Sequence, residues 1–257
     1  MSILSSLPLW AVFVLTTVLF FVGYEAGHVA GRRRRSRGAE EKEELGSLVG
    51  AMLGLLGFII AITFGSQLAR YDAAKGLLLD EATAIYTTFL RADMLPDAAR
   101  DETRELLYRY TRARSDTNRD VTERIREAER FQGELWRIAI SASPGIPEQF
   151  PQEVYFDSLN EVIALHEKRV TVGISHRMPA TFWIVLYVLA VLSFVVTGYH
   201  GGVSSGSRSP IRPIAVLGFA VLVMLVADLD DFGQGGLRVD QAALNDVADR
   251  MGEALVR

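Results

Sequence analysis

The chain has 257 residues, a net charge of −4 and no cysteine, and its mean hydropathy is +0.20. The lack of cysteine excludes disulfides and thiolate metal sites, and so small a net charge does not indicate nucleic acid as a partner. The apolar residues are gathered in blocks, which is typical of membrane proteins, so we expect the lipid bilayer to be a partner.

The first apolar block covers residues 7–22 and is followed by a basic run of arginines at residues 32–37. No Lys or Arg precedes the block, and no small-x-small cleavage site separates it from the basic run. We therefore interpret it as a first transmembrane helix rather than a cleaved signal peptide.

The second apolar block, residues 46–64, reads GSLVGAMLGLLGFIIAITF and carries no charge. Its length is close to the roughly 20 residues that a helix needs to cross a bilayer. Small residues recur along it at helical spacing, which is typical of a seam where another backbone packs closely. The alternative is that several copies gather around this helix and leave a lumen with an apolar constriction. The candidate pore-lining residues are Gly50, Gly54, Gly57, Phe58, Ala61, Ile62 and Gly65.

The second span is predicted to continue into water as one amphipathic helix, because no proline or turn-forming pair occurs before Pro96. Proline at a first helical position predicts a new helix there. A charged hairpin is expected to turn near residues 115–118, and a second long helix to begin near Pro151 and lead toward the third span.

Two further spans are expected at residues 181–197 and 214–227, joined by a flexible loop at residues 199–213. An amphipathic helix that begins at Val239 is then expected to lie on the membrane or on the helical stalk formed by the extensions of the second and third spans. The predicted fold class is an all-α membrane protein with four transmembrane helices, the second and third extended into a helical stalk or hairpin domain. The predicted division is transmembrane helices 1 and 2 in residues 1–66, an extramembrane helical domain in 67–178, transmembrane helices 3 and 4 in 179–231, and the C-terminal amphipathic helix in 232–257.

Catalytic or metal-binding chemistry is not predicted from this sequence. The histidines His28, His166, His176 and His200 do not show the spacing of a zinc-binding helix, so we expect no metal site and no cofactor. Residues 202–206 match G-x-S-x-G, but the match falls in the expected interhelical loop and not at a strand-to-helix turn, so we interpret it as chance. The protein is not predicted to be an enzyme.

Polar residues near the span ends are the candidates for a pore mouth or a polar network. Asp228 is either a solvated boundary marker or a carboxylate that faces a watery cavity or pairs with Arg70 or Arg177. Arg70, Asp72 and Glu81 are predicted to form a buried network that holds helices in register, in preference to an ion-binding site. The candidate set is Arg70, Asp72, Glu81, Asn160, Asp228 and Asp230.

Short motifs distributed over most of the chain resemble the bestrophin-like family of bacterial membrane proteins. They are Gly54-Leu55-Leu56-Gly57 with Thr63-Phe64, Arg70-Tyr71-Asp72, Asp80-Glu81-Ala82, Leu159-Asn160-Glu161, and Asp228-Leu229-Asp230 followed by Gly236 and Val239. True bestrophins are oligomeric anion channels whose second helix lines an apolar neck. The resemblance therefore implies a similar role for the second span here.

The first functional hypothesis is a homo-oligomeric ion channel, with anion conduction as the form that the resemblance implies, so that the partners are other copies of the chain and inorganic ions. The alternative is a non-conducting scaffold or sensor whose stalk binds a protein, favoured by the charged segment 101–130.

The protein is expected in the bacterial inner membrane. The positive-inside rule places the arginine loop, residues 31–45, in the cytoplasm and the domain 67–178 in the periplasm, although Arg70, Lys75 and Arg177 flank the membrane on that outer side.

Overall fold

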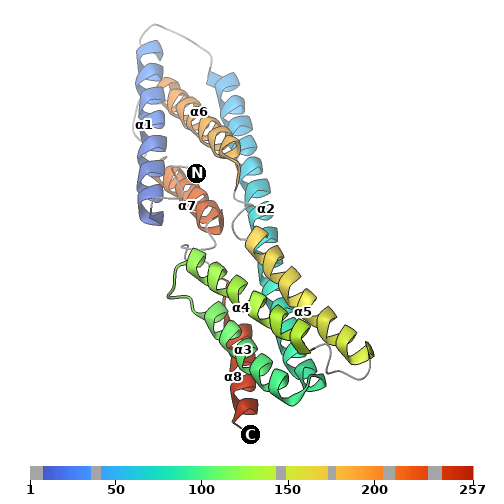
Figure 1. Cartoon of the computed structure of the whole chain (residues 1–257). Coiled ribbons are helices and arrows are strands. Elements are labelled where there is room, and N and C mark those ends of the chain that lie inside the picture. The colour runs from blue at the N-terminus through green and yellow to red at the C-terminus, as the bar shows by residue number, and fades with distance from the viewer. Residues whose placement is uncertain are drawn as a thin grey trace. The chain divides into compact units, whose positions relative to one another are not determined.

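The computed structural model describes residues 8–35, 42–142, 149–172, 178–204, 212–230 and 239–256. These residues form eight α-helices and one short 3-10 helix, and no strand occurs among them (Figure 1). The chain divides into two compact units, residues 1–69 with 177–237 and residues 70–176 with 238–257. The prediction of an all-α membrane protein is confirmed.

Unit 1 contains α1 (Leu9–Arg35), the first part of α2 (Lys42–Arg91), α6 (Ala180–Ser204) and α7 (Arg212–Asp230). Among the described residues, α1, α2 and α6 are long and apolar enough to cross a membrane. The 19 residues of α7 extend over about 28 Å, just short of the ~30 Å hydrocarbon layer, so a fourth span stays a prediction. The core of the unit is built from side chains such as Phe20, Leu56, Trp183, Phe194 and Val223.

Glycines allow α1 and α6 to pack backbone against backbone. A Cβ added to Gly27 would lie 2.0 Å from the carbonyl oxygen of Val195, and one added to Gly198 would lie 2.0 Å from that of Tyr24. The next turn repeats the arrangement at Gly31 and Gly202, where the corresponding distances are both 2.3 Å. Such close approach is possible only without side chains, and it is the usual way that membrane helices associate.

Two expectations about loops are wrong. Residues 199–204 belong to α6 and not to a flexible loop, because Gly202 is buried against α1. Arg32 to Arg35 form the last turn of α1 and are not part of a loop. Basic side chains are favourable in that position because they face the partial negative charge of the helix C-terminus.

Unit 2 contains the rest of α2, followed by α3 (Asp97–Ser115), α4 (Val121–Ala142), α5 (Gln149–Val170) and α8 (Ala242–Leu255). The helix after Pro96 and the turn after Ser115 are confirmed. Asp120 caps α4, since its carboxylate accepts a hydrogen bond of 2.8 Å from the backbone N–H of Thr122. The C-terminal helix α8 packs against α3 in this unit.

The α2 helix is continuous over 50 residues, which corresponds to a length of about 75 Å. Residues 66–71 lie within it without a loop, so the predicted continuation of the second span is confirmed. Leu56 and Ile60 of α2 belong to the core of unit 1, whereas Ile85 and Phe89 belong to the core of unit 2.

Candidate functional site

The candidate pore-lining residues lie on a face of α2 that the chain leaves largely uncovered. Phe58 is 61 % exposed and Ile62 is 54 % exposed, while Leu56 and Ile60 on the other face are buried. A Cβ added to any of the four candidate glycines, Gly50, Gly54, Gly57 and Gly65, would have no neighbour within 4 Å in the part of the chain that the structure describes. The interpretation of this stripe as a packing seam is therefore wrong for contacts within one chain, and the seam lies between α1 and α6.

The coverage of α2 differs from that of the other spans. Within its most apolar window 11 % of residues are buried, compared with 28 % in both α1 and α6. The low value leaves α2 with a wide apolar surface for contacts outside the chain. Residues 46–69 also lack any charged side chain, so this surface cannot bind an ion by charge. In channels, hydrophobic constrictions gate by excluding water.

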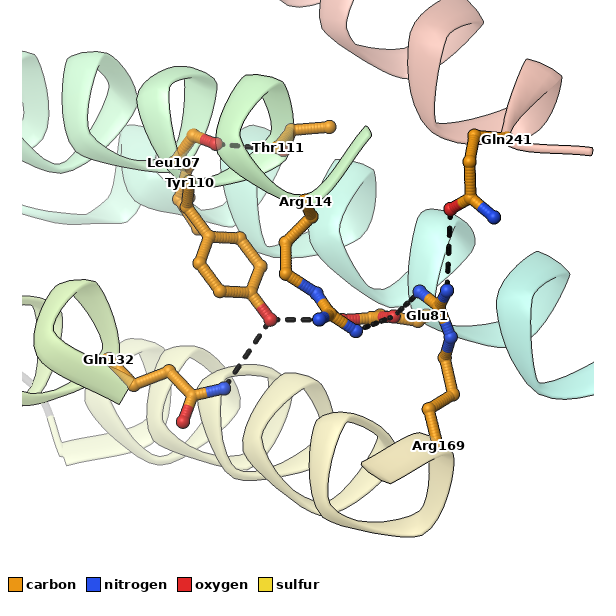
Figure 2. A network of polar contacts seen from close by, with 8 residues as sticks. All are labelled: Glu81, Leu107, Tyr110, Thr111, Arg114, Gln132, Arg169 and Gln241. Atoms are coloured by element: carbon orange, nitrogen blue, oxygen red, sulfur yellow. Dashed lines mark hydrogen bonds and ion pairs between the residues drawn. The ribbon is translucent and has the colours of Figure 1, made fainter. Parts of the chain in front are cut away.

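A buried polar network in unit 2 is centred on Glu81, which is 0 % exposed (Figure 2). Arg114 donates to both carboxylate oxygens at 3.2 and 3.3 Å, and Arg169 also donates to Oε2. The hydroxyl of Tyr110 donates to Oε1 at 2.9 Å and accepts a bond of 3.3 Å from Gln132. The network joins side chains of α2, α3, α4 and α5.

The charges in this network are strongly coupled. Burial acts to raise the pKa of Glu81, but the neighbouring Arg114 and Arg169 outweigh it and lower the pKa from 4.5 to about 2. Burial and the charge of Glu81 raise the pKa of Tyr110, so its hydroxyl stays protonated and able to donate. The arrangement therefore holds helices together and offers no group poised for proton transfer.

The structure brings Glu81 into a buried network as predicted, with partners other than Arg70 and Asp72. Arg70 precedes Glu81 by three helical turns on α2, a rise of about 16 Å, which exceeds the reach of the two side chains. Asp72 and Asn160 are both exposed. The sequence did carry a signal for the true partners, because Arg114 and Arg169 fall on the apolar stripes of α3 and α5.

The two candidate aspartates of α7 are not solvated in the same way. Asp228 is 9 % exposed, so the interpretation as a solvated boundary marker does not hold for it. Asp230 accepts a hydrogen bond of 2.8 Å from the backbone N–H of Met178, which ties the end of α7 to the chain just before α6. Arg177, considered as a partner of Asp228, lies outside the described residues.

Two further groups of polar residues were not predicted from the sequence. Among the described residues, one set of potential metal ligands comes together, Glu129 of α4 with His166 and Glu167 of α5. The sequence separates Glu129 from the other two by more than 30 residues, so no spacing rule could have found it. An open polar pocket of about 560 Å³ lies at the hairpin of α3 and α4 and is lined in part by Arg109, Arg112, Arg119 and Glu127.

These features define an all-α membrane protein in which one long helix carries an uncovered apolar face in the span and a buried carboxylate network beyond it. A family model described as the Bestrophin-like domain matches residues 8–244. The chain belongs to the bestrophin-like family.

Solved structures of a bacterial bestrophin homolog from Klebsiella pneumoniae share the fold. One is 14 % identical with a TM-score of 0.67 and covers 97 % of this chain and 99 % of its own. A single-residue variant of that homolog is 14 % identical with a TM-score of 0.68, covering 95 % and 99 % of the two chains. Another is 13 % identical with a TM-score of 0.65, covering 96 % and 98 %. A search of curated proteins finds no match.

Proposed function

We propose that the protein is a homo-oligomeric ion channel of the bacterial inner membrane, with the uncovered face of α2 lining the pore. The observation that carries this proposal is the stretch of α2 from Gly50 to Gly65, where a Cβ added to any of the glycines would meet no described residue within 4 Å. Membership of the bestrophin-like family supports the same role, because true bestrophins are oligomeric anion channels with an apolar neck formed by the second helix.

Phe58 and Ile62 are proposed to form the constriction. They are the large apolar side chains among the candidates, and they lie about one helical turn apart on the exposed face. Rings of such side chains around an axis would exclude water from the narrowest part of the pore. Anions pass an apolar neck more readily when they are weakly hydrated, because less water must be removed, so iodide should permeate better than chloride.

Ion flux into liposomes tests the proposal. The reconstituted protein should conduct, and Phe58→Ala should raise the flux because it widens the constriction. Trp10→Ala is the matched control, since Trp10 is a large aromatic that is 69 % exposed on α1, outside the proposed lining. If the protein gives no flux at any tested voltage and pH, or if both variants change the flux equally, the proposal fails.

The orientation in the membrane forms part of the proposal. The exposed arginines Arg32 to Arg35 end α1, which favours a cytoplasmic C-terminal end of α1 and a periplasmic unit 2. Because the chain has no cysteine, single introduced cysteines can report the side of the membrane without background.

The hairpin pocket favours a second candidate function, a scaffold or sensor that binds a protein partner through unit 2. Arg119 is already paired there with Glu127 at 2.6 Å and with Asp116 at 3.1 Å. Arg112 has only a longer pair of 3.8 Å with Asp249, and Arg109 lies over the ring of Phe131, which leaves these two as the more available positive groups. A monomer in detergent that co-purifies with a partner protecting Arg109 and Arg112 from modification, together with absent flux, would favour this candidate over the channel.

A further inference from the structure

Three potential metal ligands meet between α4 and α5 in unit 2. The ligand atoms of Glu129, His166 and Glu167 all lie within 4.8 Å of one another. Both carboxylate side chains are exposed, and the structure gives neither of them an ion pair with the described residues. The carboxylates are therefore open to solvent and free to turn toward an ion.

His166 is the observation that separates this group from an ordinary acidic surface. Its side chain is 0 % exposed, and neither ring nitrogen has a hydrogen-bond partner among the described residues. Buried polar groups are nearly always satisfied, so an imidazole left in this state needs a cause. A nitrogen of this ring lies in the same cluster as the two carboxylate oxygens, where an ion would satisfy it.

The protonation state of the ring is compatible with metal binding. Burial lowers the pKa of His166 to about 4, and the positive charge of Arg114 acts in the same direction. The imidazole is consequently neutral near pH 7 and keeps a lone pair for a ligand. The carboxylates of Glu129 and Glu167 supply negative charge that offsets the guanidinium groups of Arg114 and Arg169 near His166.

The donor set indicates the class of metal. One imidazole nitrogen with two carboxylate oxygens suits Zn²⁺ and similar transition metals, whereas Ca²⁺ prefers 6–8 oxygen ligands at about 2.3–2.6 Å. Ligand atoms on one tetrahedral zinc ion lie about 3.4 Å apart, given zinc–ligand distances near 2.1 Å. The cluster must therefore close slightly, and the exposed glutamates can do so by rotation of their own side chains.

We propose that Glu129, His166 and Glu167 form a binding site for a divalent transition-metal ion of the zinc class, which would bridge α4 and α5 through three protein ligands. The fourth position of a tetrahedral site would be left for water, as in zinc sites with three protein ligands. The site goes beyond ion conduction and does not depend on it, so a chain that fails to conduct can still bind the metal.

Calorimetric titration of the detergent-solubilised full chain with ZnCl₂ tests the proposal. The double variant Glu129→Gln/Glu167→Gln should bind one zinc ion fewer per chain than the unmodified protein, and because both residues are exposed this variant should fold. The matched control is Glu105→Gln/Glu161→Gln, which removes the same charge from exposed positions on α3 and α5 and should bind as the unmodified protein does.

Three more measurements test the site. His166→Asn should weaken zinc binding by more than about tenfold, since even outer-sphere partners of a metal contribute 10–100-fold. Mg²⁺ and Ca²⁺ should not compete, and Co²⁺ should bind with the visible absorption of a nitrogen- and oxygen-ligated ion that the glutamine double variant lacks. Absence of zinc binding to the unmodified protein, or equal stoichiometry in the double variant and its control, would overturn the assignment.

Discussion

Glu81→Gln is expected to destabilise unit 2, because two buried guanidinium groups would lose the carboxylate that they share. The side chain of Glu81 is 0 % exposed, and those of Arg114 and Arg169 are 8 % and 16 % exposed. Removing one partner from a buried ion pair costs about 3–5 kcal/mol. The lowering of the pKa of Glu81 from 4.5 to about 2 corresponds to about 3 kcal/mol, which lies in the same range.

The same pKa difference fixes how stability depends on pH. The folded-state pKa of Glu81 is below its ordinary value, so its stabilising contribution is complete above pH 4.5 and is lost as the pH falls toward about 2. The glutamine variant cannot be protonated in this range. Its stability should therefore fall less steeply than that of the unmodified protein between these two pH values.

Thermal unfolding of the detergent-solubilised protein at pH 7 and pH 3 provides the assay, with hydrogen exchange in α3 and α5 to locate the effect in unit 2. Asp72→Asn is the matched control, since Asp72 is an exposed carboxylate on the same helix and its loss should change stability by less than about 0.5 kcal/mol. Adding Arg114→Met and Arg169→Met to Glu81→Leu should recover much of the loss, because no unpaired charge would then be buried. If Glu81→Gln were as stable as Asp72→Asn, the reasoning about this network would be refuted.

The remaining predictions concern the seam, the network hydroxyl and the orientation in the membrane. Gly27→Ala should lower the unfolding temperature sharply, because its Cβ would lie 2.0 Å from a backbone oxygen of α6. Gly54→Ala should leave the monomer as stable as before or up to about 1 kcal/mol more stable. Equal effects of the two substitutions would contradict the α1–α6 seam. Tyr110→Phe removes a donor to Glu81 and should cost about 1–3 kcal/mol in thermal unfolding, and a neutral result would show that the hydroxyl bond does not contribute. An impermeant thiol reagent added outside intact cells should label Thr117→Cys and not Ser36→Cys, and the reverse pattern would show that the orientation is inverted.

The fold could be predicted from the sequence wherever a local pattern decides the structure. The continuity of α2 follows from the lack of any breaking residue before Pro96, and the start of α3 follows from that proline. The ends of α1 and α6 could not be predicted in this way. Gly27 and Gly198 are far apart in the chain, and only their packing against each other explains why glycine-rich residues 198–204 stay helical.

The candidate site was predictable in part for a similar reason. Helical spacing identifies Glu81 as a charge within an amphipathic segment, and it also places Arg114 and Arg169 on buried stripes. The pairing of these three residues depends on how α2, α3 and α5 pack together, which no single segment encodes. The group of Glu129, His166 and Glu167 has the same origin, since it exists only where α4 meets α5.

The measurement that tests the channel proposal most directly is block of ion flux through a cysteine placed on the exposed face of α2. Phe58→Cys in liposomes should conduct and then lose its flux when a charged methanethiosulfonate reagent is added, because the attached charge would occupy the apolar constriction. Trp10→Cys, exposed on α1, should conduct with or without the reagent. Full flux through modified Phe58→Cys, or equal block of both variants, would show that this face of α2 does not line the pore.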